Sequence, residues 1–139
     1  MCWWLGNIYS IHSEKSPEPH FYITLNEPEN SEHLVLVNIT DERHQDKSCI
    51  LIPGDISFIY KNSVIAYEYA ELITVDELQR KINLKIIKEI NNPIKTPKSV
   101  LEKVLRGALI SQYLEFDTEE YIQNQSRNSL QIHLPSYRH

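Results

Sequence analysis

The stretch PHFYITLNEPENSEHLVLVNIT, from Pro19 to Thr40, holds two strand-like segments joined by a polar connection. In the first, apolar side chains at positions 21, 23 and 25 alternate with less apolar ones at 22, 24 and 26, a period of two that is typical of a half-buried strand. The second, LVLVNIT, is apolar on both faces until Asn38 and Thr40. With EPENSE between them, the segments predict an antiparallel hairpin of strands 20–26 and 33–40.

Three polar side chains stand out in this hairpin. His20 begins the first strand and Thr40 closes the second, so antiparallel pairing is expected to bring them close together. Asn38 interrupts an otherwise apolar strand, and a buried amide has to find hydrogen-bond partners. We expect Asn38 to bond to a neighbouring loop.

The flanking sequence predicts further strands and two helices. MCWWLGNIYSIHS is expected to contain a first strand, CILI at 49–52 a short buried strand, and SVIAYEYAELIT at 63–74 a long strand with two apolar faces. Thr74 is predicted to cap a helix that begins VDELQRKI. Thr96 is predicted to cap a second helix, with Pro97 at its first position and an apolar stripe that packs on the sheet. The stripe consists of Val100, Leu101, Val104, Leu105, Ala108 and Leu109.

These elements predict one mainly β domain of the α+β class over residues 1–114. Its architecture is expected to be a small, SH3-like curved antiparallel sheet or half-open barrel, followed by C-terminal helices that cover one side of it. In 115–139, FDTEEYIQN is a candidate for one more short helix, and the remaining tail is expected to be mobile or to bind a partner.

Composition restricts the classes of function. The chain has 139 residues, 41% of them hydrophobic, and a net charge of -5, which argues against a strongly basic, nonspecific nucleic-acid binder. Basic residues nevertheless gather between positions 80 and 106, where only Glu89 and Glu102 are acidic. They are either a solvated face or a binding patch. The basic residues are Arg80, Lys81, Lys85, Lys88, Lys95, Lys98, Lys103 and Arg106.

The cysteines and the hydropathy pattern point to a reduced, cytoplasmic protein. Cys2 and Cys49 form neither a disulfide framework nor a zinc ligand set, and we expect no cofactor or metal. The apolar N-terminal run lacks the basic start of a signal peptide. No run approaches the roughly 20 apolar residues that span a bilayer, so no membrane role is expected.

The order of segments resembles the PemK/MazF-like family of SH3-like barrel proteins, whose best-known members are RNA-cutting toxins. Pro19 precedes HFYITLN, and VNIT ends at Thr40 where the family has a Pro-hydrophobic-Thr element. The stretches KNSVIAYEYAELITVDELQRKI and TPKSVLEKVLRGALISQYL then follow in the family's order, so the resemblance covers roughly residues 3–114. It implies a homodimeric endoribonuclease restrained by an antitoxin protein. The family's Gly-Asp opening and the arginine beside the proline are missing, so of its catalytic residues only Thr40 carries over directly.

Metal-independent RNA cleavage needs a base, an acid and a donor that stabilises the phosphorane charge. The candidate catalytic residues are therefore His20 as base or acid, Lys61 as the cation that holds the phosphate, and Thr40 and Ser63 as hydrogen-bond donors. Two of them have a simpler alternative, since His20 can be an ordinary edge residue and Thr40 a turn cap.

A function of a different class fits the same fold. In it, the domain is a non-catalytic module that binds a protein or nucleic acid through the C-terminal tail and the basic helical segment, with Lys98, Lys103 and Arg106.

Several other side chains have both a structural and a functional interpretation. Cys49 is expected to be a packed, inert thiol. His44 and Asp46, with Glu42, form either a metal site or a solvated turn. The aromatic residues stack on nucleic-acid bases if exposed, or belong to the core; they are Trp3, Trp4, Tyr60, Tyr67 and Tyr69.

Overall fold

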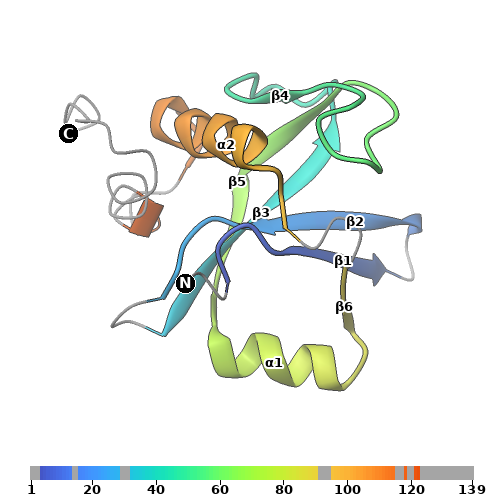
Figure 1. Cartoon of the computed structure of the whole chain (residues 1–139), viewed down its shortest axis with the longest axis vertical. Coiled ribbons are helices and arrows are strands. Elements are labelled where there is room, and N and C mark those ends of the chain that lie inside the picture. The colour runs from blue at the N-terminus through green and yellow to red at the C-terminus, as the bar shows by residue number, and fades with distance from the viewer. Residues whose placement is uncertain are drawn as a thin grey trace.

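The computed structural model describes residues 4–13, 16–28, 32–90, 95–114, 118 and 121–122. These residues form a curved six-stranded sheet with two helices (Figure 1), and every strand pair is antiparallel. The strand order is β4-β5-β3-β2-β1-β6. The predicted fold class, a small α+β domain built on an SH3-like half-open barrel, is confirmed. Along the chain the elements are β1 (Ile8–Ser13), β2 (Ser16–Thr24), β3 (His33–Asp41), β4 (Ile50–Leu51), β5 (Ser63–Thr74), α1 (Val75–Asn83), β6 (Ile87–Glu89) and α2 (Lys98–Ile110).

Strand β3 lies inside the sheet, between β2 and β5, and it is buried on both faces. Leu34 and Leu36 pack in one hydrophobic cluster, to which α1 contributes Leu78. The intervening Val35 and Val37 pack in a second cluster, together with the apolar stripe of α2. The two helices therefore cover opposite faces, as Figure 1 shows with α1 and α2 on either side of the sheet. The expectation that both cover one side was wrong, because a central strand with two apolar faces needs cover on both.

All the predicted strands occur, and some of them begin or end at other residues than predicted. β5 begins and ends where the sequence predicts, whereas β2 begins earlier, at Ser16, and β4 is limited to two residues. β6 was not predicted. Its three residues lie in the basic segment, and they pair with β1 at Ile11↔Ile87 and Tyr9↔Glu89. So short a strand has no period of its own, and pairing with β1 stabilises it.

The two predicted helix caps differ in outcome. Thr74 caps α1 as expected, since its Oγ1 accepts a hydrogen bond of 3.1 Å from the backbone N–H of Glu77. Thr96 does not cap α2, which begins after Pro97. Both the hydroxyl and the backbone N–H of Thr96 donate to the carbonyl of Gly6, at 2.9 and 2.8 Å. The threonine thus ties the start of α2 to the N-terminal segment.

Asn38 was expected to bond to a loop, and this was wrong. Its Nδ2 donates, at a long 3.5 Å, to the carbonyl of Phe21 on the adjacent strand β2. The amide is 8% exposed and lies beside the register shift between β3 and β5. A local break in the ladder thus explains why an amide is accommodated in an apolar strand.

The predicted short helix and tail of 115–139 lie mostly outside the described residues. Of that segment, Thr118 and Ile122 are buried, and Ile122 packs in the same hydrophobic cluster as α2. Within the described part of the chain, no helix has the length and apolar character that crossing a membrane requires.

Candidate functional site

A pocket of about 260 Å³ is lined by the first half of β2, the end of β3 and the loop before β5. His20, Thr40, Lys61 and Ser63, the four residues proposed from the sequence as catalytic, all line it. The remaining lining residues are Glu18, Pro19, Phe21, Ile39, Asp41, Arg43, Phe58, Ile59 and Tyr60. The structure thus brings together residues from three separated segments, and their catalytic roles stay predictions.

Strand register explains why these residues meet. β2 pairs with β3 at Phe21↔Ile39, so the next residues outward are His20 and Thr40, whose expected proximity is present. β3 pairs with β5 at Thr40↔Val64 and Asp41↔Ser63. The first half of β2, the end of β3 and the start of β5 therefore lie side by side, and the loop that precedes β5 contributes Lys61.

The charges of the pocket centre on Asp41. Its Oδ1 accepts hydrogen bonds from the backbone N–H and the Nε of Arg43, at 2.9 and 3.0 Å, and its Oδ2 accepts one of 3.1 Å from the Nζ of Lys61. The backbone N–H of Arg43, followed by Lys61, lowers the pKa of Asp41 to about 2. The same contact with Asp41 raises the pKa of Lys61. Asp41 and Lys61 are consequently both charged at neutral pH.

The candidate site residues differ in how accessible they are to a ligand in the pocket. Ser63 is 7% exposed, and its hydroxyl donates to the carbonyl of Lys61 at 3.1 Å, so its proton is used inside the protein. Thr40 is half-buried and His20 is exposed at the pocket wall. The geometry therefore favours His20, Thr40 and Lys61 over Ser63 as groups that touch a ligand.

Sequence reasoning missed Arg43, which lines the pocket with its side chain 88% exposed. In the toxin family that the sequence resembles, an arginine stands beside the proline, and this sequence lacks it. Arg43 supplies a guanidinium in the same pocket from the loop that follows β3. The sequence could have indicated Arg43, because it lies in the segment DER, three residues after the candidate Thr40.

Aromatic rings form one wall of the pocket. Phe21 and Phe58 are stacked, with ring centroids 4.1 Å apart and planes inclined by 18°. Tyr60 is 73% exposed, and the Nζ of Lys61 lies 5.8 Å from its ring centroid. An exposed tyrosine beside cations suits a flat, anionic ligand such as a nucleotide.

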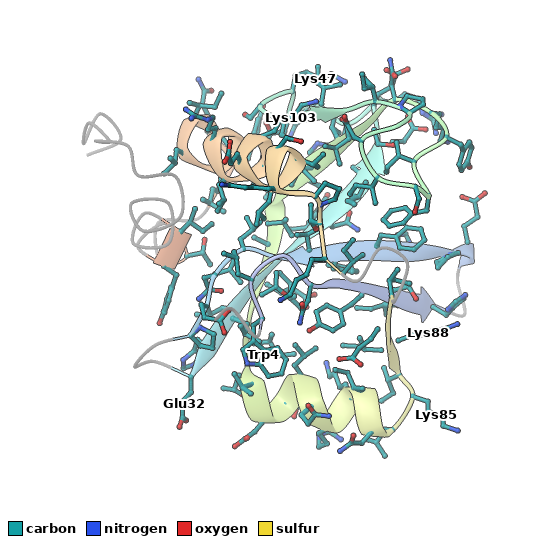
Figure 2. All side chains as sticks on the ribbon, in the orientation of Figure 1. Trp4, Glu32, Lys47, Lys85, Lys88 and Lys103 are labelled. Atoms are coloured by element: carbon teal, nitrogen blue, oxygen red, sulfur yellow. The ribbon has the colours of Figure 1, made fainter. Side chains whose placement is uncertain are left out.

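The other aromatic residues that were candidates for stacking on nucleic-acid bases lie in different environments. Tyr67 is buried and donates to the carbonyl of Val104 at 2.6 Å, so it belongs to the core. Trp4 packs against the cluster beside α1 (Figure 2). Tyr69 is 61% exposed, and its ring lies 5.9 Å from that of His44, away from the lining of the pocket. Trp3 lies outside the described residues.

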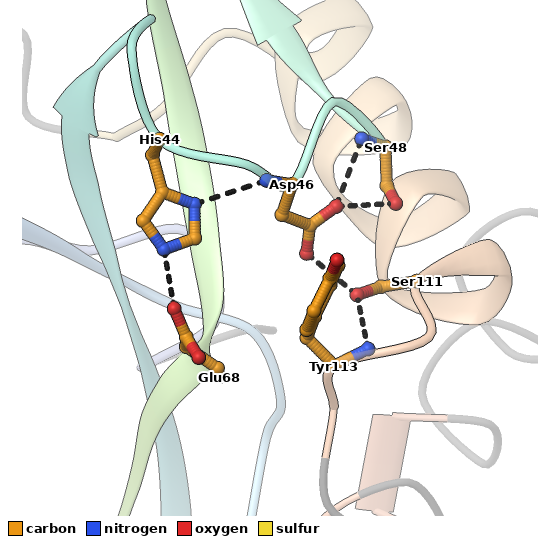
Figure 3. A network of polar contacts seen from close by, with 6 residues as sticks. All are labelled: His44, Asp46, Ser48, Glu68, Ser111 and Tyr113. Atoms are coloured by element: carbon orange, nitrogen blue, oxygen red, sulfur yellow. Dashed lines mark hydrogen bonds and ion pairs between the residues drawn. The ribbon is translucent and has the colours of Figure 1, made fainter.

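The loop that follows β3 is anchored on two sides (Figure 3). Nε2 of His44 lies 2.5 Å from Oε1 of Glu68 on β5. Asp46 is 2% exposed and accepts hydrogen bonds from Ser48 and from the hydroxyl of Ser111 at the end of α2. Glu42 is exposed, as the solvated-turn alternative predicts, but the burial of Asp46 does not fit that alternative, because a buried carboxylate needs hydrogen-bond donors. Among the described residues, no group of three or more His, Cys, Asp or Glu side chains is arranged to hold a metal ion.

The basic segment 80–106 does not form one surface. In Figure 2, Lys85 and Lys88 lie near α1 and β6, whereas Lys103 lies on α2 on the other side of the sheet. Lys103 also donates to Asp55 at 3.2 Å, which neutralises part of its charge. Of the three residues proposed as a binding patch, Lys98 and Arg106 remain exposed on α2.

Comparison with known proteins adds no relative: no known protein family, no curated protein and no solved structure matches the chain. The chemistry of the pocket has to be argued from its own residues.

Proposed function

We propose that this protein is a metal-independent endoribonuclease of the PemK/MazF-like toxin type, and that the pocket around His20 and Lys61 binds the scissile phosphodiester. The observation that supports the proposal is that His20, Thr40 and Lys61 line one pocket although they come from different segments of the chain. Arg43 adds a second cation beside them. An imidazole, two cations and a hydroxyl are the groups that phosphodiester transfer requires.

The proposed reaction is cleavage by the RNA's own 2′-hydroxyl. His20 takes the 2′-OH proton, the 2′-oxygen bonds to phosphorus, and the bond to the 5′-oxygen breaks, so that a 2′,3′-cyclic phosphate forms. The protonated imidazole or water then gives a proton to the leaving 5′-oxygen. Lys61 and Arg43 stabilise the extra negative charge of the phosphorane, Thr40 donates a hydrogen bond to it, and Tyr60 offers a ring on which a base stacks.

The proposal includes the partners that the resemblance implies. A homodimer would place two such pockets in one molecule, and an antitoxin that occupies the pocket would keep RNA out. The acidic net charge of -5 restricts nonspecific attraction to RNA, so binding depends on the local cations of the pocket.

The experiment is cleavage of a long, mixed-sequence RNA in EDTA with mapping of the new ends. We expect discrete cuts that end in 2′,3′-cyclic phosphate. His20→Ala and Lys61→Ala should each reduce the rate at least about a hundredfold, since a positioned acid–base or charge-stabilising group contributes that much. His12→Ala, which removes an exposed histidine on β1 outside the pocket lining, is the matched control and should cut like the wild type. Equal cleavage by wild type and His20→Ala would remove His20 from the mechanism.

A second function is favoured by one specific observation, the exposure of Lys98 and Arg106 on α2. In this alternative the domain binds nucleic acid or protein without turnover. It predicts intact RNA in the experiment above, together with salt-sensitive binding that weakens in Lys98→Ala and Arg106→Ala. Unchanged binding in both variants would rule out the α2 surface.

A further inference from the structure

The cations of the pocket already have an anion. Both carboxylate oxygens of Asp41 are occupied, one by Arg43 and the other by Lys61. Carboxylate and phosphate oxygens bind guanidinium and ammonium groups in the same way. A phosphate that enters the pocket therefore meets two cations that each already donate a hydrogen bond to a carboxylate.

The position of Asp41 makes this competition a fixed feature of the site. Asp41 ends β3 opposite Ser63 of β5, and the backbone N–H of Arg43 binds its carboxylate. Its side chain is 30% exposed, compared with 53% for Lys61 and 88% for Arg43. The anion is the most buried member of the group, and the two cations extend farther into solvent.

Titration does not release the cations near neutral pH. Hydrogen bonds from Arg43 and Lys61 hold the pKa of Asp41 at about 2, and the pKa of Lys61 is raised by the same pair. Glu18, which also lines the pocket, adds a second negative charge near Lys61. Near neutral pH the charged carboxylate therefore stays beside Lys61 and Arg43 and neutralises part of their charge.

We propose that Asp41 is an internal competitor for the RNA phosphate, and that its carboxylate lowers the affinity of the pocket by occupying Arg43 and Lys61. This inference rests on the proposed function, since it assumes that the pocket binds a phosphodiester. An entering RNA phosphate has to share these cations with the carboxylate or displace it from them. Binding is therefore weaker than the number of cations alone would give.

The test is binding of a fluorescein-labelled, mixed-sequence 2′-O-methyl oligoribonucleotide, which lacks the attacking hydroxyl, measured by fluorescence anisotropy in EDTA at low salt. Asp41→Asn keeps an amide oxygen for the N–H of Arg43 and removes the charge. We expect it to bind about three- to thirtyfold more tightly than the wild type, the range for removing one or two exposed ion pairs. The matched control is Glu77→Gln, which loses the same charge and an exposed ion pair to Arg80 on α1. It should bind like the wild type.

The outcomes separate this inference from the proposed function. If Asp41→Asn binds no more tightly than Glu77→Gln while wild-type binding is lost in Lys61→Ala, the pocket binds RNA and the competitor role is wrong. If neither the wild type nor Asp41→Asn binds, or if Lys61→Ala binds equally well, both proposals fail. Should Asp41→Asn not fold, as judged by circular dichroism, Asp41→Ser provides the same comparison with a shorter acceptor.

Discussion

Cys49 shows how burial decides the chemistry of a single residue. Its side chain is 2% exposed in the cluster beneath α2, and burial raises the pKa of its thiol to about 11. The nearby Lys103 lowers that pKa by a smaller amount. The predicted packed thiol is confirmed by this burial, and a nucleophilic role has no support because the thiolate is the reactive form.

We expect Cys49 in the native protein to react with iodoacetamide at least about a hundredfold more slowly at pH 8 than in the unfolded chain, since a pKa near 11 leaves that much less thiolate than one near 9. Because a raised pKa delays ionisation, labelling should rise with pH up to about 11. Peptide mass spectrometry after timed labelling gives the rate at Cys49 itself. The same reaction in guanidinium chloride is the control, and equal rates in the two conditions would contradict the inferred burial.

At the scale of the element, α2 depends on the absence of one side chain. A Cβ at Gly107 would lie 2.5 Å from the hydroxyl of Tyr67, 2.7 Å from the Cβ of Cys49 and 3.0 Å from the carbonyl of Ser48. The hydroxyl cannot move away cheaply, because it donates to the carbonyl of Val104 at 2.6 Å. The glycine thus lets α2 approach the start of β4 closely.

Gly107→Ala should destabilise the protein even though alanine is the better helix former. Overpacking costs about 1–3 kcal/mol, and the gain in helix propensity offsets about 1 kcal/mol, so we expect a net loss of up to roughly 2 kcal/mol. Urea unfolding monitored by circular dichroism measures it. Arg106→Ala, the exposed neighbour on the same helix, should stay within about 0.5 kcal/mol of the wild type. A more stable Gly107→Ala protein would show that α2 shifts freely on the sheet.

Periodic elements were predictable and non-periodic ones were not. Local signals predict both the bounds of β5 and the cap of α1. β5 is an apolar run, and the hydroxyl of Thr74 accepts its hydrogen bond from the backbone N–H only three residues further along the chain. β6 and the real role of Thr96 depend on partners far along the chain, β1 and Gly6. Local patterns cannot carry such information, because these contacts exist only after the sheet has closed.

The same distinction applies to the candidate site. The proximity of His20 and Thr40 follows from hairpin register, so one pair could be predicted from the sequence. The Asp41 ion pairs with Arg43 and Lys61 join groups two and 20 positions away from it, and no period or spacing indicates them. The carboxylate at the pocket was therefore missed although its strand had been predicted.

At the scale of the whole molecule, the loop that carries Asp46 is joined to two other parts of the fold. Asp46 lies in the loop that also carries Arg43, and this loop reaches β5 through His44 and Glu68 (Figure 3). Oδ2 of Asp46 accepts a hydrogen bond of 2.7 Å from the hydroxyl of Ser111, which in turn accepts one of 3.1 Å from the N–H of Tyr113. The loop beside the pocket is thus fixed to the end of α2.

Asp46→Asn should therefore weaken both the fold and the pocket. An amide offers one acceptor oxygen where the carboxylate uses two, so a buried hydroxyl or N–H loses its partner and the expected loss is about 1–3 kcal/mol of unfolding free energy. Urea unfolding measures it, with Glu42→Gln, an exposed carboxylate of the same loop, as the control of equal charge. Equal stability of the two variants would mean that the loop is held without Asp46. Because this loop carries Arg43, a loosened loop should also reduce oligonucleotide binding in the folded Asp46→Asn protein.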